Sequence, residues 1–198
     1  TDWVCPARPT IQPDLTVLPT SYVDDAPLRA VKIDFQLRLA TCNILTLRSG
    51  PTNKAPDLGA EAPSRLEWIL KSLDELGVHV FALQETRIRT VRKQVDDRYI
   101  LVKSAATAAG QFGIMIGFSK RLPFALQTCL ESSECEPVKL LLGEQDLSIV
   151  VAEPRLLVVK IQHPGFRCLV IAAHAPHTGA ATHEIEEYWK HVDSGIPQ

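Results

Sequence analysis

The sequence predicts a single domain of the mixed α/β (α+β) class, and three observations predict it. Residues 36–83 combine a strand pattern, a capped helix and a second strand pattern. Residues 113–118 and 140–173 contain short apolar runs bounded by turn signals, and a helical pattern follows them. The 198 residues, 45% hydrophobic and 22% charged, are enough for one hydrophobic core.

The first part of the chain is predicted to be a lead-in without a defined fold. Five prolines fall within the first 30 residues, where they fix φ and remove amide donors. We therefore expect residues 1–35 to be extended or disordered, and residues 36–198 to form the domain. Because the chain starts with Thr1, we also expect it to be part of a longer protein.

The first structural unit is predicted to be a strand, a helix and a parallel strand. The first strand is Gln36–Leu47, and the second is Val78–Leu83. Between them lies the helix Ser64–Leu76, which begins with the capping box of Ser64 and Glu67 and carries apolar residues at helical spacing. Such a crossover is right-handed and brings the ends of its two strands to one edge of a sheet.

The second half of the chain is predicted to be mainly antiparallel. The expected strands are Tyr99–Lys103, Gly113–Phe118, Leu147–Ala152, Leu156–Ile161 and Cys168–Ala173. Pro164 and Gly165 favour a type II turn, so the last two strands should form a hairpin. The final helix is expected at about Thr182–Val192, while Leu122–Lys139 gives no clear prediction.

The composition restricts the possible partners and surroundings. The net charge of −2 requires any nucleic-acid surface to be local. Five cysteines without a C-x-x-C pair favour an intracellular, reducing compartment and argue against structural zinc. The sequence contains no apolar run of about 18 residues that would span a membrane, and no feature points to a protein partner.

Three polar residues stand where predicted apolar strands end, namely Asn43, Glu85 and His174. Amide and carboxylate oxygens are hard ligands that suit Mg²⁺ or Mn²⁺. A nearby imidazole could bind a phosphate oxygen or move a proton. These residues together predict a metal-dependent site for phosphodiester hydrolysis. Taken singly, each is also compatible with a polar side chain that only ends a strand.

A basic cluster follows Glu85 directly and comprises Arg87, Arg89, Arg92 and Lys93. Four cations in seven positions are usually a solvated loop. Beside a carboxylate at a strand end, the same cluster would also suit contacts with the phosphates of a nucleic acid.

Three motifs resemble a known family. TCNI at 41–44, LQET at 83–86 and AHAPH at 173–177 resemble, in order and spacing, motifs of the endonuclease/exonuclease/phosphatase superfamily. The resemblance implies a four-layer α/β sandwich, in which Asn43 and Glu85 hold the metal and His174 takes part in catalysis. Gly110–Ile116 looks like a loosened form of the family's glycine-led strand, and His177 falls where many members have an asparagine that contacts the phosphate.

The stretch Thr178-Gly179-Ala180 resembles the nucleases of non-LTR retrotransposons. The implied activity is that of a Mg²⁺-dependent (or Mn²⁺-dependent) endonuclease that cuts DNA, for which a nuclear location would be suitable. The basic cluster would then be the rim that contacts the DNA backbone.

Two motifs of the resembled family are absent from the sequence. The chain contains neither Asp-x-Asn nor Asp-His, which in the family help to orient and activate the attacking water. We therefore expect a C-terminally incomplete domain with an incomplete second sheet and little activity of its own. Two alternatives stay open: a phosphatase or phosphodiesterase of this fold that acts on an inositol phosphate or phospholipid headgroup, and a non-catalytic remnant.

Overall fold

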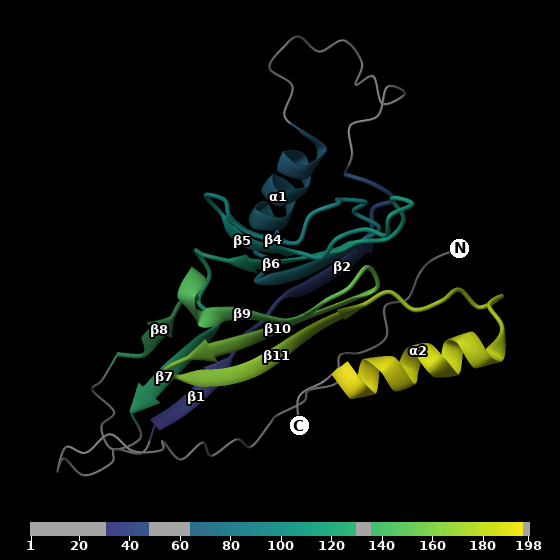
Figure 1. The fold of residues 1–198 in the computed structure, drawn as a ribbon. Helices are drawn as coiled ribbons and strands as arrows, with labels where there is room; N and C mark the ends of the chain where they lie inside the picture. Colours follow the sequence, from purple (N-terminus) through teal and green to yellow (C-terminus); the bar gives the residue numbers. More distant parts are fainter. Residues whose placement is uncertain (1–30, 48–63, 130–135, 196–198) are drawn as a thin grey trace, which may run out of the picture.

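The computed structural model describes residues 31–47, 64–129 and 136–195, and residues 1–30 of the predicted lead-in lie outside these ranges. The described chain forms three β-sheets and two α-helices (Figure 1). The strands are β1 (Val31–Phe35), β2 (Leu39–Asn43), β3 (Val80–Gln84), β4 (Arg92–Val95), β5 (Tyr99–Lys103), β6 (Ile114–Ser119), β7 (Ala125–Cys129), β8 (Val138–Leu140), β9 (Leu147–Ala152), β10 (Leu156–His163) and β11 (Phe166–Ala173). The helices are α1 (Arg65–Glu75), α2 (Thr182–Gly195) and the short 3-10 helix η1 (Glu144–Asp146).

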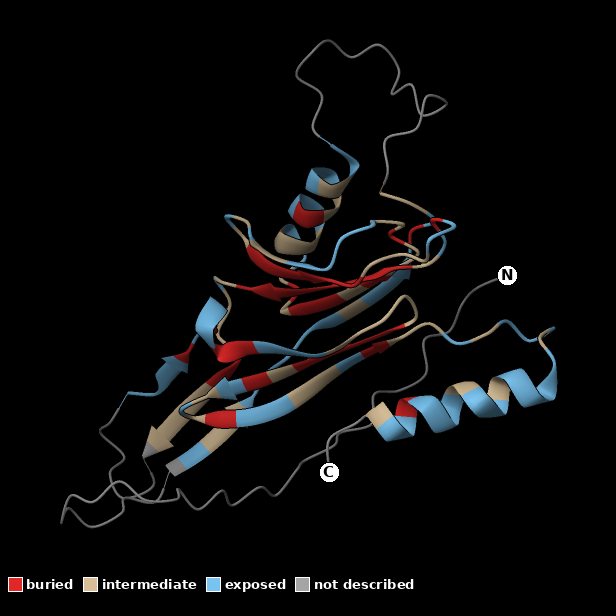
Figure 2. Ribbon diagram, in the orientation of Figure 1, coloured by how far each residue is buried: buried red, intermediate tan, exposed pale blue. Residues whose placement is uncertain are grey.

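A five-stranded sheet in the order β2-β3-β6-β5-β4 forms the centre of the fold. Strands β2 and β3 are parallel, with Leu39 opposite Val80 and Asn43 opposite Gln84, and the other neighbours in this sheet are antiparallel. The predicted parallel crossover through α1 is therefore confirmed. Strands β3, β5 and β6 are mostly buried, because both faces of this sheet are covered (Figure 2).

Helix α1 covers one face of the five-stranded sheet (Figure 1). Ser64 is its N-cap, and its hydroxyl accepts a hydrogen bond of 3.2 Å from the Glu67 N–H, as the capping signal predicts. Leu70 is buried at the centre of the apolar face of α1, where it packs with Phe81 and Met115 of the sheet. The helix ends at Glu75, and Gly77 has a positive φ of 64° that suits the turn after it.

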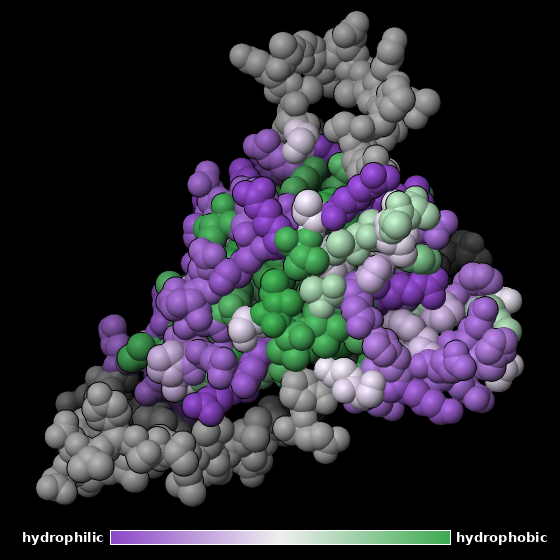
Figure 3. Space-filling view, viewed as in Figure 1, coloured by the Kyte–Doolittle hydropathy of each residue, from purple (hydrophilic) through white to green (hydrophobic). Residues whose placement is uncertain are grey.

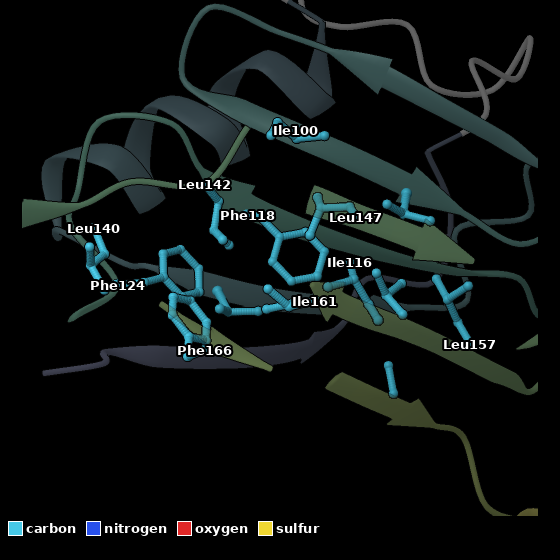
Figure 4. Packing of buried hydrophobic residues seen from close by; sticks show 14 of the residues in the cluster. Ile100, Ile116, Phe118, Phe124, Leu140, Leu142, Leu147, Leu157, Ile161 and Phe166 are labelled. Atoms are coloured by element: carbon cyan, nitrogen blue, oxygen red, sulfur yellow. The ribbon is translucent and has the colours of Figure 1, made fainter. Parts of the chain in front are cut away.

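Two three-stranded sheets pack on the opposite face, in the orders β11-β10-β9 and β1-β7-β8. The core between the layers contains Ile116 and Phe118 from the central sheet, together with Leu157 and Ile161 from β10 (Figure 4). Phe124 and Phe166 extend this core with stacked rings whose centroids are 6.4 Å apart. The predicted β10–β11 hairpin is confirmed, since the two strands pair along their full length around the Pro164-Gly165 turn.

Helix α2 lies on the outer side of β10 and β11 (Figure 1). Its Val192 is buried against Leu156 and Val158, while Tyr188 is half-buried in the same cluster. The described chain thus has α1, the central sheet, the smaller sheets and α2 in succession. The mixed α+β class predicted from the sequence is confirmed.

Four strands differ from the sequence prediction. Val31–Phe35, which we assigned to the lead-in, forms β1 and pairs with β7. Strand β7 and most of β8 lie in the stretch that gave no clear prediction, and β4 begins within the basic cluster. These short strands mix polar with apolar residues, so their pairing depends on partners distant in the sequence.

Two edge strands expose apolar residues on the same side of the fold. Figure 3 shows apolar side chains gathered in the middle of one face, where the two sheet layers meet. Strands β2 and β11 each pair on only one side within the described residues. Leu39 of β2 is 67% exposed and Ile171 of β11 is 40% exposed. Unpaired edges of this kind offer free main-chain donors and acceptors.

We predict that Gly117→Ala destabilises the protein by about 1–3 kcal/mol. Gly117 lies opposite Phe81 in the β3–β6 ladder, and an added Cβ would overlap the Phe81 ring, which is 1% exposed. Urea unfolding measures the loss. Adding Phe81→Leu should recover part of the stability of the Gly117→Ala variant, because it removes the ring that the methyl group meets. If the double variant lost as much stability as Gly117→Ala and Phe81→Leu lose separately, this explanation would be contradicted.

Candidate functional site

The ends of the two parallel strands bring Asn43 and Glu85 into direct contact. The Asn43 Nδ2 donates a hydrogen bond of 2.8 Å to Glu85 Oε1. The Asn43 Oδ1 accepts a bond of 3.1 Å from the Leu45 N–H, which fixes the orientation of the amide. This contact is possible because β2 and β3 are parallel neighbours in register, with Asn43 beside Gln84.

His174 reaches the same point from the second sheet layer. It follows β11 directly, and its N–H donates to the Arg155 carbonyl over 2.9 Å, which continues the pairing of β10 and β11 by one residue. The His174 Nε2 lies 3.8 Å from Glu85 Oε1. The three residues singled out in the sequence therefore lie together, at the edge where both sheet layers end.

The backbone around these residues adopts unusual conformations. Four non-glycine residues of the described chain have a positive φ, namely Leu45, Glu85, Arg87 and Phe112. All four lie beside the Asn43–Glu85 contact, in the segments that follow β2 and β3 or precede β6. A left-handed conformation costs about 1–2 kcal/mol for an L-residue, so this geometry persists only where the surroundings impose it.

Main-chain hydrogen bonds impose the conformation of the Glu85 segment. The Thr86 N–H donates to Gly113 O at 3.0 Å, and the Arg87 N–H donates to Phe112 O at 2.8 Å. Gly113 has a φ of 88°, and a Cβ there would lie 2.9 Å from the Thr86 hydroxyl oxygen. Glycine is required at this position for both reasons. The glycine-led segment Gly110–Ile116, predicted from the sequence, thus holds the Glu85–Arg87 segment in place through main-chain hydrogen bonds.

An aromatic ring and a guanidinium form one wall of the site. The Phe112 ring lies edge-on to the His174 ring, with centroids 5.7 Å apart. The Arg155 guanidinium carbon lies 4.0 Å from the centroid of the Phe112 ring, within the range of a cation–π contact. Sequence reasoning missed both residues. Phe112 directly precedes the predicted strand, but nothing in the sequence relates Arg155 to it.

The charges of Glu85 and His174 follow from their neighbours. The hydrogen bond from Asn43 lowers the pKa of Glu85, contacts with Arg87 and His174 lower it further, and desolvation acts against them. Burial lowers the pKa of His174, the Glu85 carboxylate opposes this effect, and Arg155 lowers the pKa again. Near neutral pH, the site therefore holds a carboxylate beside a neutral imidazole.

The neutral imidazole of His174 is better placed to act as a hydrogen-bond donor than as a general base that takes a proton from water. Its Nε2 faces the carboxylate, whereas its Nδ1 is buried without a hydrogen-bond partner among the described residues. A second proton on Nδ1 would be a buried donor without an acceptor, which is unfavourable. His174 can thus donate through Nε2 to an anionic oxygen, while the described part of the chain places no carboxylate at its Nδ1 to support a role as general base.

The donor set suits a hard cation that keeps most of its water. The Glu85 side chain is 19% exposed, and its Oε2 is contacted by the Arg87 guanidinium at 3.4 Å. The described residues contain no group of three or more His, Cys, Asp or Glu side chains that could hold a metal ion. A carboxylate and an amide oxygen are ligand types that Mg²⁺ takes together with water and phosphate, and they do not fit a zinc site. In the structure, however, Asn43 turns its Nδ2 toward Glu85, and its Oδ1 accepts from the Leu45 N–H.

The predicted phosphate-contacting residues are placed differently from one another. Arg87 contacts Glu85, while Arg89 is exposed and makes no hydrogen bond or ion pair with the described residues. Arg92 is exposed at the start of β4. Lys93 donates instead to the carbonyl oxygens of Glu144 at 2.9 Å and Leu147 at 3.4 Å. The predicted phosphate contact of Lys93 therefore lacks support in this arrangement.

His177 lies in the loop that follows β11. Its side chain is exposed, and its Nδ1 accepts a hydrogen bond of 3.0 Å from the Gly179 N–H. This bond shapes the loop and leaves Nε2 available. The structure gives no contact between His177 and Asn43, Glu85 or His174 within the described residues, so its role as a phosphate contact stays a prediction.

A cavity of about 380 Å³ lies beside the site but is chemically unlike it. It is bounded by α1 and strands β2 and β3, and Cys42, Trp68 and Leu83 contribute to its largely apolar lining. Asn43, Glu85 and His174 are not among its lining residues. The polar site is therefore an open edge of the sheets and not this cavity.

No protein-family model matches the chain, and no curated protein is similar to it at a significant level. In the described residues, neither helix has the length and apolar character needed to cross a membrane.

We predict that Glu85 makes the stability of the protein depend on pH. A carboxyl group with a lowered pKa stabilises the folded state above its ordinary pKa, and this stabilisation is lost as the pH falls through the folded value. Wild type should therefore lose more stability than Glu85→Gln between about pH 7 and about pH 3. Urea unfolding across this range measures the difference.

The matched control for this experiment is Glu75→Gln, which changes an exposed glutamate of α1. The difference in free energy of unfolding between Glu75→Gln and wild type should change much less across the same pH range. An equal pH dependence in wild type and Glu85→Gln would show that the carboxylate is not stabilised by its neighbours.

Proposed function

We propose that these residues form the metal-binding and phosphate-binding part of a Mg²⁺-dependent phosphodiesterase that acts on DNA. The observation that carries the proposal is the meeting of Asn43, Glu85 and His174 at the ends of three strands from two sheet layers. The strained backbone beside them supports it, since such strain is concentrated at functional sites.

The proposed family is the endonuclease/exonuclease/phosphatase superfamily, with a non-LTR retrotransposon-type endonuclease as the favoured member. The order of the motifs in the sequence supports this assignment. The succession of a helix, two sheet layers and a second helix is compatible with a partial form of the family's four-layer sandwich.

Glu85 and Asn43 would hold the metal ion. A bound Mg²⁺ would neutralise phosphate charge and stabilise the leaving oxygen. To place its Oδ1 on a cation held by Glu85, Asn43 would have to turn its amide and exchange its hydrogen bonds with Glu85 and the Leu45 N–H for the bond to the metal. His174 would donate from Nε2 to a non-bridging phosphate oxygen, which is a role for a neutral imidazole.

Activation of the attacking water is the step that these residues do not supply. The sequence has no Asp-x-Asn or Asp-His motif, and the His174 Nδ1 has no partner among the described residues. A general base typically contributes about 10²–10⁴-fold to the rate. We therefore propose that the chain as given binds metal and DNA but hydrolyses DNA poorly by itself.

DNA is the favoured substrate because the basic residues lie next to the carboxylate. Arg87, Arg89 and Arg92 lie in the segment that runs from Glu85 into β4. The net charge of the chain is −2, so this local cluster is the feature that would attract a polyanion. Contacts from exposed arginines to phosphates position a nucleic acid without reading its sequence.

We predict that the protein binds Mn²⁺ through Glu85. Mn²⁺ takes the place of Mg²⁺ at oxygen sites and can be followed by electron paramagnetic resonance. Glu85→Ala should weaken binding at least about tenfold, because it removes the anionic ligand. Asn43→Ala should have a smaller effect, while Glu75→Ala on the exposed face of α1 should have none. Unchanged Mn²⁺ binding in Glu85→Ala would contradict the proposed metal site.

We also predict that DNA binding weakens steeply as the salt concentration rises. Arg89→Ala should lower the slope of log K against log salt by about 1, the value for one lost phosphate contact. Lys93→Ala should leave this slope unchanged, because the Lys93 ammonium is bound to Glu144 and Leu147. Fluorescence anisotropy with a short duplex measures both variants.

The alternative substrate gives a different result in the same assay. An inositol phosphate lacks the condensed counterion layer of a long polyanion, so its binding should depend less steeply on salt than the binding of DNA. Tight binding of an inositol phosphate together with negligible affinity for DNA would favour the headgroup phosphatase. Failure to bind either ligand would favour the non-catalytic remnant.

A further inference from the structure

Helix α2 is attached to the β9–β10 turn by two side chains that lie one helical turn apart. The Tyr188 hydroxyl donates a hydrogen bond of 3.2 Å to the Arg155 carbonyl. The His191 Nε2 lies 2.6 Å from Glu153 Oε2. Both contacts fall on the turn between β9 and β10, which comprises Glu153, Pro154 and Arg155.

The same turn holds the parts of the candidate site. The Arg155 carbonyl accepts the N–H of His174 at 2.9 Å, and the Pro154 carbonyl accepts the N–H of Gly113 at 2.9 Å. The Arg155 guanidinium lies over the Phe112 ring, and this ring packs against the imidazole of His174. A displacement of the turn would therefore move the imidazole relative to Glu85.

We propose that Tyr188 is a positioning residue that fixes the imidazole of His174 through the carbonyl they share. This inference rests on the proposed function, in which His174 contacts the phosphate. The Arg155 oxygen accepts hydrogen bonds both from the Tyr188 hydroxyl and from the main chain of His174. The hydroxyl therefore sets the direction of a carbonyl on which the placement of His174 depends.

The other anchor of α2 provides a contrast. Within the described residues, the His191 ring hydrogen-bonds to the carboxylate of Glu153, which is two residues away from Arg155. Loss of that contact would loosen the helix without removing a donor from the shared carbonyl. The ring of Tyr188 packs in the cluster around Leu156 and Val158, and Tyr188→Phe keeps this packing. The two substitutions thus separate the helix attachment from the positioning of His174.

The first test uses nuclear magnetic resonance of the histidine ring at one fixed pH near 8. Ring-current shifts from Phe112 make the His174 signals sensitive to small displacements. Tyr188→Phe should move these signals, whereas His191→Ala should leave them in place while lowering the melting temperature. Replacement of Tyr188 by 4-aminophenylalanine, which keeps a donor at the same position, should restore them. Unmoved His174 signals in Tyr188→Phe, or equal movement in His191→Ala, would overturn the proposal.

The second test is a double-mutant cycle on DNA affinity. Tyr188→Phe should weaken binding about two- to fivefold in wild type and have no further effect in His174→Ala, because both changes act on one contact. Additive losses would overturn the proposal. The His174 ring signals can be recorded without metal or DNA. A protein that binds neither ligand would therefore refute the proposed function, and the first test would still decide whether Tyr188 positions His174.

Discussion

The site depends on the hydrogen bond between Asn43 and Glu85, and this bond depends on the parallel pairing of β2 and β3. An antiparallel pair would place the two side chains at opposite edges of the sheet. The crossover through α1 enforces the parallel pairing, and the apolar face of α1 holds the crossover on the sheet through Leu70. A capped helix distant from the chemistry therefore brings the carboxylate and the amide together.

The strained backbone gives this meeting point a definite geometry. Glu85 and Arg87 are left-handed on either side of Thr86, which is fully buried. Such an alternation aims the Glu85 side chain at Asn43 while the main chain of Thr86 and Arg87 bonds to the Phe112–Gly113 segment. Hydrogen bonds in a dry environment offset the cost of the strain, which is why the conformation persists. The carboxylate is thus placed by backbone contacts that no single side chain controls.

Sequence patterns predicted the strand ends but not the contacts between distant segments. An apolar run that stops at a polar residue identifies Asn43, Glu85 and His174 without knowledge of the fold. Adjacent basic residues, in contrast, are not equivalent on a strand: Arg92 and Lys93 point to opposite faces of β4, and Lys93 reaches η1. Strand β1 escaped prediction because its pairing partner β7 lies about 90 residues further along the chain. Arg155 was likewise not predictable, because only the β9–β10 turn brings it to Phe112.

Two of the three site residues lie at the ends of edge strands, so a further chain segment could add side chains to the site at these edges. Asn43 ends β2 and His174 follows β11, and both strands pair on one side only within the described residues. Exposed Leu39 and Ile171 mark the same free edges. A segment that pairs with either edge would run beside the site residues. Arg87 and the Phe112–Gly113 segment already contact the Glu85 segment on its other flank, so a further chain segment would meet the carboxylate from the β2 or β11 edge.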